Sequence, residues 1–114
     1  MLAAKHRLRK KKDIGQVLKE GKSSKEGPLV LKTIKNNLGF CRFAFIVSRK
    51  VSQKAVVRNK IRRKMREAVR LKVENCQPGT DSLFIALPGK IKKDSLGEIE
   101  GCVEHLLRRN KILG

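Results

Sequence analysis

The residues with the clearest chemical potential are basic side chains concentrated between positions 49 and 72. This segment carries 11 of the 29 Lys and Arg residues of the chain, and Glu67 is its only acid. A guanidinium can donate two parallel hydrogen bonds to a phosphate, so several arginines at fixed spacing can follow a nucleic-acid backbone. The segment therefore predicts a phosphate-binding surface.

A long helix is expected to hold these side chains, because residues from about 53 to 74 contain neither Gly nor Pro. At about 100° per residue, its apolar side chains form one stripe that would face a core. The stripe consists of Val57, Ile61, Met65 and Ala68, and the exposed face opposite carries Asn59, Arg62, Arg63, Arg66 and Arg70. Almost no Glu lies one turn away to neutralise these arginines, which favours a binding face over a solubilising one.

Shorter elements are expected to support this helix. Residues 11–20 place Ile14, Val17 and Leu18 at helical spacing, and Gly21 provides a stop. Residues 22–27 are expected to form a loop, and strands are expected over residues 28–34, 40–47 and 82–88. The second of these strands should present Cys41, Phe43, Phe45 and Val47 on one face.

A last helix is indicated by a capping box formed by Ser95 and Glu98. Its apolar positions at helical spacing are Leu96, Ile99, Val103, Leu106 and Leu107. The expected order of elements is α-β-β-α-β-α without repeats, which is an α+β fold.

The composition indicates one small domain that binds a polyanion. The chain has 114 residues and a formal charge of +19, and 39% of its residues are hydrophobic. No apolar stretch is long enough to cross a membrane, and the basic N-terminus lacks the apolar segment of a secretory signal. We therefore expect a cytoplasmic protein whose partner is a nucleic acid, with residues 1–10 as a flexible basic arm or as a further contact to phosphates.

The residue types that catalysis needs are scattered. Cys41, Cys76 and Cys102 are far apart in the sequence and lack the spacing of a zinc site, so we interpret them as reduced thiols. Neither histidine, His6 or His105, belongs to an arrangement of Ser, Cys or Asp that suggests a nucleophile and its base. Three acids on the last helix, Glu98, Glu100 and Glu104, are explained by capping and exposure. We predict no catalytic residue and no metal or cofactor held by the chain itself.

The segment Phe43-Ala44-Phe45-Ile46 invites comparison with the RNA-recognition motif, whose exposed aromatics stack on bases. The flanking positions do not fit, because Cys41 and Arg42 stand where a basic residue and Gly are required and Ser48 replaces the last aromatic. The order of elements also differs. These phenylalanines are better explained as core residues of a buried strand.

Residues 45–70, FIVSRKVSQKAVVRNKIRRKMREAVR, resemble the protein subunit of bacterial ribonuclease P. A buried strand ending in Ser-basic-basic is followed by a helix with the family's Arg-Asn-Arg pattern, which reads Arg58-Asn59-Lys60 in this chain. Further pieces occur in the family's order, including Arg7-Leu8, LVL in the first strand and IALP in the third. The resemblance covers nearly the whole chain.

The resemblance implies a two-layer α+β sandwich with a mixed sheet and an unusual left-handed β-α-β crossover, related to ribosomal-protein domains. It also implies a holoenzyme in which a large RNA subunit, using magnesium, removes the 5′ leader of precursor tRNA while the protein assists. No obligate protein partner is expected. The residues that would contact the catalytic RNA are Arg49, Lys50, Arg58, Asn59, Lys60, Arg62, Arg63, Arg66 and Arg70.

The family receives the single-stranded leader between its first helix and the open face of the sheet, often with aromatic side chains. Here Ile14, Leu18 and Lys32 occupy those positions, so base stacking is not expected from them, and Lys32 could contact a phosphate. Two other classes remain open from the residues alone. One is a ribosomal protein of related fold with a structural role, and the other is a self-sufficient nuclease, for which the sequence supplies no acid cluster.

Overall fold

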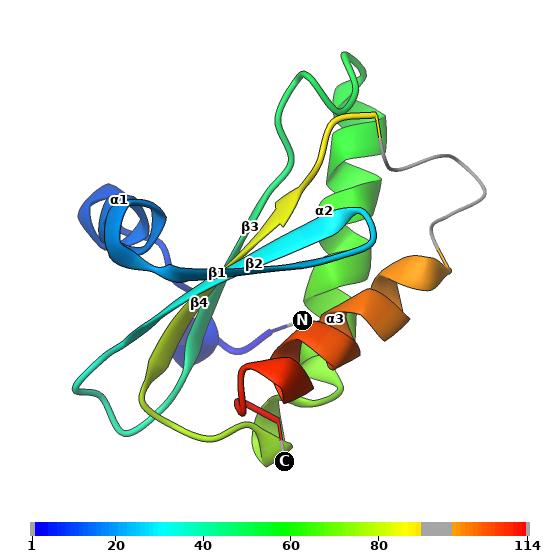
Figure 1. The fold of residues 1–114 in the computed structure, drawn as a ribbon. Helices are drawn as coiled ribbons and strands as arrows, with labels where there is room; N and C mark the ends of the chain where they lie inside the picture. Colours follow the sequence, from blue (N-terminus) through cyan, green and yellow to red (C-terminus); the bar gives the residue numbers. More distant parts are fainter. Residues whose placement is uncertain (1, 90–96, 114) are drawn as a thin grey trace.

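The computed structural model of the chain describes residues 2–89 and 97–113. The three α-helices are α1 (Lys11–Glu20), α2 (Ala55–Arg70) and α3 (Glu98–Arg109). The four strands are β1 (Lys22–Glu26), β2 (Leu29–Lys35), β3 (Arg42–Ile46) and β4 (Thr80–Ala86). Two short 3-10 turns, η1 (Ala4–His6) and η2 (Val73–Asn75), complete the described elements (Figure 1).

The strands form one mixed sheet in the order β1-β2-β4-β3. β2 is antiparallel to both β1 and β4, whereas β3 is parallel to β4. The chain passes from β3 through α2 to β4, which is the β-α-β unit that the resemblance implies. The left-handed sense of this crossover stays a prediction from the resemblance. The expected α+β class is confirmed.

The prediction of a loop over residues 22–27 was wrong, because residues 22–26 form β1. Its sequence, KSSKE, has no apolar alternation from which a strand could be recognised. Pairing with β2 decides its conformation, since Lys22 opposes Thr33 and Glu26 opposes Leu29 across a tight turn. Gly27 makes this turn with a φ of 54°, a conformation that residues with a side chain rarely adopt.

The two faces of the sheet carry two separate apolar clusters, with α1 over one face and α2 and α3 over the other (Figure 1). The larger cluster joins Phe43 and Phe84 of the sheet to Met65 of α2 and Val103 of α3. The smaller cluster places Val17 of α1, which is fully buried, against Leu83. Alternation along β2, β3 and β4 supplies both clusters, since successive side chains point to opposite faces.

The core face of α2 is confirmed at three of its four predicted positions. Ile61, Met65 and Ala68 are buried, but Val57 is 38% exposed. Val57 lies in the first turn of the helix, and contact with the core begins one turn later, at Ile61. Val69, which the predicted stripe omits, is fully buried.

The last helix begins at Glu98, with Gly97 as its N-cap. Ser95 and Leu96, which the sequence analysis places in this helix and its capping box, lie outside the described residues. The four other predicted apolar positions are all buried against the sheet and α2; they are Ile99, Val103, Leu106 and Leu107.

Residues 2–10, which we expected to be a flexible arm, lie against the sheet. Leu2 and Leu8 are buried, at 1% and 4% exposure, and belong to different clusters. The Leu8 amide donates to the Phe43 carbonyl at 2.8 Å, and Arg7 and Phe43 form a parallel bridge. The segment thereby covers part of the free edge of β3, because two leucines anchor an otherwise basic stretch.

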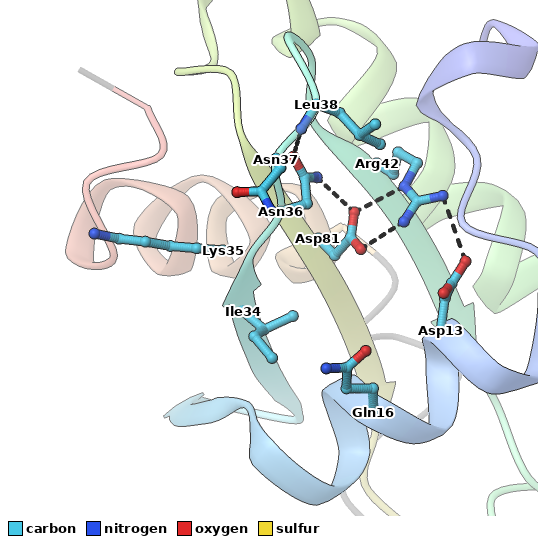
Figure 2. Close-up of a pocket in the computed structure, with 9 residues that line it drawn as sticks. All are labelled: Asp13, Gln16, Ile34, Lys35, Asn36, Asn37, Leu38, Arg42 and Asp81. Atoms are coloured by element: carbon cyan, nitrogen blue, oxygen red, sulfur yellow. Dashed lines mark hydrogen bonds and ion pairs between the residues drawn. The ribbon is translucent and has the colours of Figure 1, made fainter.

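A nearly buried ion pair joins α1, β3 and β4. Asp81 of β4 is 5% exposed and accepts from Arg42 of β3 through Nε at 2.8 Å and Nη2 at 2.7 Å. Asn36 donates a third hydrogen bond to Asp81, and Asp13 of α1 lies 3.5 Å from Arg42 Nη1 (Figure 2). The hydrogen bond to Asp81 raises the pKa of Arg42 above its usual value. The network therefore fixes α1 over the ends of two strands.

We expect Asp81→Ala to lower the free energy of unfolding by about 3 kcal/mol, because it leaves a half-buried guanidinium without its main partner. Urea denaturation at pH 7 measures this loss. Asp13→Ala is the matched control, since it changes the net charge equally but removes only the longer, more exposed contact, and it should cost less than about 1 kcal/mol. Equal losses in the two variants would contradict the central role of Asp81.

Candidate RNA-binding surface

Three arginines, Arg58, Arg62 and Arg66, lie one turn apart along the side of α2 nearest β3. Arg58 Nη1 donates to the carbonyls of Ser52 and Gln53 at 2.9 and 3.0 Å. Arg62 Nη2 donates to the Asn59 side chain, and its Nη1 lies 3.5 Å from the Val47 carbonyl. These bonds use only some of the five donors of each guanidinium, so they orient the groups and leave donors for phosphates. Asn59 thus acts here as a support for Arg62.

The neighbouring side of α2 is more exposed. Lys60, Arg63 and Lys64 line a shallow hollow of about 240 Å³ together with Glu67. Within the described ranges, neither Lys60 nor Arg63 has a hydrogen bond or ion pair to another side chain. These two cations are therefore free to meet an external phosphate.

Arg70 differs from the other arginines of the predicted site. Its Nε donates to Glu67 Oε2 at 2.8 Å, and this bond lowers the pKa of the Glu67 carboxyl below its usual value. The expectation that the exposed face lacks neutralising acids does not hold at this end of the helix, because Glu67 lies three residues before Arg70. We therefore expect the weakest phosphate contact at this position.

The N-terminal segment extends the basic surface beyond α2. Arg7, Arg9 and Arg66 line a second hollow of about 230 Å³ whose floor includes Phe43 and Phe45. Arg7 Nε donates to the Leu2 carbonyl at 2.8 Å, which fixes its position. The sequence placed Arg66 and Arg9 more than 50 residues apart, and only the docking of residues 2–10 on the edge of β3 brings them together.

Arg49 and Lys50 lie in the turn between β3 and α2, and both are exposed. The turn is closed by the Val51 amide, which donates to the Ser48 carbonyl at 3.0 Å. Because β3 ends at Ile46 and α2 begins at Ala55, both residues lie near the N-terminal end of the arginine row. The structure thus gathers the predicted RNA contacts around one helix and the turn before it.

The three residues predicted for the leader site meet on the opposite face of the sheet. Ile14 is half-buried in the smaller cluster, and Leu18, one turn further along α1, is 40% exposed. Lys32 of β2 donates through Nζ to the Leu18 carbonyl at 3.0 Å. The Lys32 ammonium therefore offsets the partial negative charge at the C-terminal end of α1. It stays partly exposed, so a bound phosphate would share the ammonium with the Leu18 carbonyl.

The sequence analysis missed an apolar row beside these three residues. Val30, Ile85 and Ile46 are paired across β2, β4 and β3, and all three are only half-buried. Their register places them on the same face as Lys32. Strand alternation could have revealed the row, because Val30 and Lys32 are two residues apart, but pairing of β3 with β4 was needed to add Ile46.

The groups considered for catalysis are dispersed or serve structural contacts. His6 donates through Nδ1 to the Cys41 carbonyl at 2.7 Å, and the exposed His105 lies 4.0 Å from Glu26. Glu104 pairs with Arg108 at 3.0 Å, and Glu100 lies 4.0 Å from Lys72. In the ranges that the structure describes, no three His, Cys, Asp or Glu side chains gather as metal ligands, and no helix is long and apolar enough to cross a membrane.

Comparisons with known proteins identify the family. The sequence profile of the family described as Ribonuclease P matches residues 2–111. The ribonuclease P protein component of Dehalococcoides mccartyi is 40% identical over 109 residues, covering 95% of this chain and 87% of that protein. That of Alkaliphilus metalliredigens is 33% identical over 112 residues, covering 98% and 99%.

Solved structures agree with the sequence relatives. The RNase P protein of Staphylococcus aureus superposes with a TM-score of 0.83 at 27% identity, covering 96% of this chain and 98% of that chain. The RNase P protein of Thermotoga maritima gives a TM-score of 0.74 at 30% identity, covering 90% and 96%. Profile, sequence relatives and fold all agree with the arginine-bearing β3-α2 unit, and the chain belongs to the ribonuclease P protein family.

Proposed function

We propose that the chain binds the catalytic RNA of ribonuclease P through α2, and that it receives the 5′ leader of precursor tRNA beside α1. Proteins of this family are subunits of the holoenzyme that hydrolyses precursor tRNA. In this proposal the RNA subunit, with its magnesium ions, carries the chemistry, and the protein positions substrate and RNA in the cytoplasm. Family membership favours this role over that of a ribosomal protein of related fold.

The observation that carries the RNA-binding role is the set of incompletely satisfied guanidiniums on one rigid helix. Arg58 and Arg62 are oriented by backbone carbonyls, while Arg63 and Arg66 have no partner among the described residues. Because hydrogen bonds already fix their side chains, Arg58 and Arg62 lose little conformational entropy on binding, which favours contacts to phosphates at a defined spacing. The net charge of +19 adds attraction at longer range.

The leader role is supported by the face on which Ile14, Leu18 and Lys32 meet. The apolar row of Val30, Ile85 and Ile46 continues from them across the sheet. Aliphatic side chains offer contact area to bases without the stacking that aromatics provide. We propose that leader bases lie over this row and that Lys32 contributes charge.

The holoenzyme role predicts a gain in leader removal at low magnesium. The chain is added to a bacterial ribonuclease P RNA with a labelled precursor tRNA, and release of the 5′ leader is followed over time. We expect faster release with the protein than without it, because the protein adds binding energy and neutralises phosphates that magnesium would otherwise screen. No gain over RNA alone at any protein concentration would refute the role.

The contacts of the arginines on α2 predict how salt affects the binding of ribonuclease P RNA. Arg62→Ala and Arg66→Ala should each lower the slope of log affinity against log salt by ~0.7 to 0.9, because each removes a phosphate contact. Filter binding of ribonuclease P RNA across a salt series measures the slope. Arg70→Ala removes the same charge from a residue paired with Glu67 and is the matched control, for which we expect little change. A uniform decrease in all three variants would mean that only net charge matters.

The leader site predicts a gain of affinity on introducing an aromatic side chain. Leu18→Phe should tighten binding of precursor tRNA by about fivefold or more, since stacking on one base contributes at least ~1 kcal/mol. Binding of mature tRNA, which lacks the leader, should not change. Val56→Phe is the control, because Val56 is 79% exposed on α2, away from this face. Tighter binding of both tRNAs, or of neither, would remove Leu18 from the leader site.

A further inference from the structure

A hollow at the outer edge of β3 combines positive charge with part of an aromatic ring. β3 pairs with β4 along one edge, and along its other edge the described residues add only the bridge between Arg7 and Phe43. Next to this bridge, a hollow of about 230 Å³ opens between the N-terminal segment, β3 and Arg66 of α2. Phe45 of β3 also lines it, so this side chain can be reached from outside the sheet.

Phe45 differs from the other phenylalanine of β3 in its burial. Phe43 is 1% exposed and belongs to the core, as the sequence analysis expects of both residues. Phe45 is only half-buried, and its ring packs against Phe84 with the ring centroids 5.9 Å apart and the ring planes within 8° of parallel. This contact holds the Phe45 ring in place. A fixed and partly exposed aromatic ring is a surface on which a base can stack.

Three arginines line the hollow beside this ring. Arg7 and Arg9 belong to the N-terminal segment, and Arg66 belongs to α2. Arg7 is fixed by its bond to the Leu2 carbonyl at 2.8 Å, whereas Arg9 and Arg66 form no hydrogen bond or ion pair within the described ranges. None of the described residues that line the hollow is an acid. The site therefore attracts an anion and has free donors with which to bind it.

The size and chemistry of the hollow fit one nucleotide. Its volume lies below the range of about 300–1,000 Å³ for sites that enclose a drug-sized ligand, so a single flat ring system is the size that fits. A nucleotide within a strand joins such a ring to a phosphate on each side, which matches an aromatic ring flanked by arginines. A second copy of β3 does not fit this edge, because its arginines would meet those of the first copy.

We propose that Phe45 contacts a base of the 5′ leader: one unstacked base enters the hollow and stacks on the ring, while Arg9 and Arg66 bind the flanking phosphates. The leader is favoured over the catalytic RNA as the source, because a single-stranded leader presents its bases without the cost of unpairing them. Ile14, one of the predicted leader residues, also lines the hollow. The inference rests on the proposed leader role and adds an aromatic contact to it.

The order of residues along β3 gives the leader a path to this ring. Ile46, at the end of the apolar row, directly follows Phe45, and successive side chains of a strand point to opposite faces. A leader that lies over the apolar row and then rounds the edge of β3 therefore meets Phe45 next. The edge strand in this way supplies the aromatic ring that Leu18 and Lys32 do not offer.

The first test uses the natural chain in a holoenzyme assembled with a bacterial ribonuclease P RNA. Precursor tRNAs carry 4-thiouridine at one leader position at a time, the complexes are irradiated, and crosslinked peptides are identified by mass spectrometry. We expect one leader position to crosslink to Phe45, within the tryptic peptide of residues 43–49. A peptide that no leader position labels, or that is labelled only from 4-thiouridine in the catalytic RNA, would overturn the proposal.

Phe45→Leu removes the ring and keeps an apolar side chain. It should weaken binding of precursor tRNA to the holoenzyme by about fivefold or more, because one base–aromatic contact is lost, and leave binding of mature tRNA unchanged. Phe45→Tyr keeps the ring and should bind as the natural chain does. Phe40→Leu is the matched control, since Phe40 is also half-buried but its ring contacts His6. Equal losses in the two leucine variants, or for the two tRNAs, would contradict a base contact.

A leader with one abasic nucleotide separates a base contact from a structural effect. At the crosslinked position, the abasic site should weaken binding to the natural holoenzyme by about fivefold or more and have little effect on the Phe45→Leu holoenzyme, because the two changes remove the same contact. Additive losses would overturn the inference. A chain that does not bind ribonuclease P RNA would overturn the proposed function as well, whereas a holoenzyme that prefers precursor to mature tRNA independently of Phe45 would overturn this inference alone.

Discussion

Carboxylates are scarce in this protein, and the structure depends on where they are used. Ten acids stand against 29 basic residues, so most cations cannot be paired within the chain. Some of the acids that form ion pairs hold separate elements together. Asp81 and Asp13 fix Arg42 between two strands and α1, and Glu26 of β1 pairs with Arg109 at the end of α3. No acid lies beside Arg58 and Arg62 on α2 before Glu67, and we propose that this unpaired charge binds phosphate.

Local sequence signals explain which parts of the fold could be predicted. α1 was predicted with its observed bounds, because an apolar triplet at helical spacing and Gly21 are local signals. The core face of α2 followed from its period, apart from Val57, whose exposure depends on where the helix passes the sheet. β1 was missed, since a polar strand is recognisable only from its partner. Pairing, unlike periodicity, is not visible in a single segment.

The candidate site, like the fold, could be predicted only in part from the sequence. The sequence predicted which arginines lie on the exposed face of α2, because successive residues of a helix are separated by a known angle. It did not predict what each arginine contacts, since carbonyls of the preceding loop orient Arg58 and Asn59 orients Arg62. The contribution of Arg9 depends on two leucines that dock the N-terminal segment on β3. Such contacts link positions whose proximity only the folded chain determines.

The position of β3 at the edge of the sheet accounts for the arrangement of both proposed binding sites. Because side chains alternate along β3, Ile46 lies on the face that carries the leader residues, and Phe45 lines the hollow that Arg66 also lines. Ile14 and Arg66 line the same hollow, so the surface proposed for the leader and the surface proposed for the catalytic RNA meet at this edge strand. An RNA that wraps this edge could contact both without a change in the fold. A central strand has a hydrogen-bonded neighbour on each side, so an RNA could not pass around it from one face of the sheet to the other. The edge position of β3, with residues 2–10 along part of it, is therefore consistent with the proposed function.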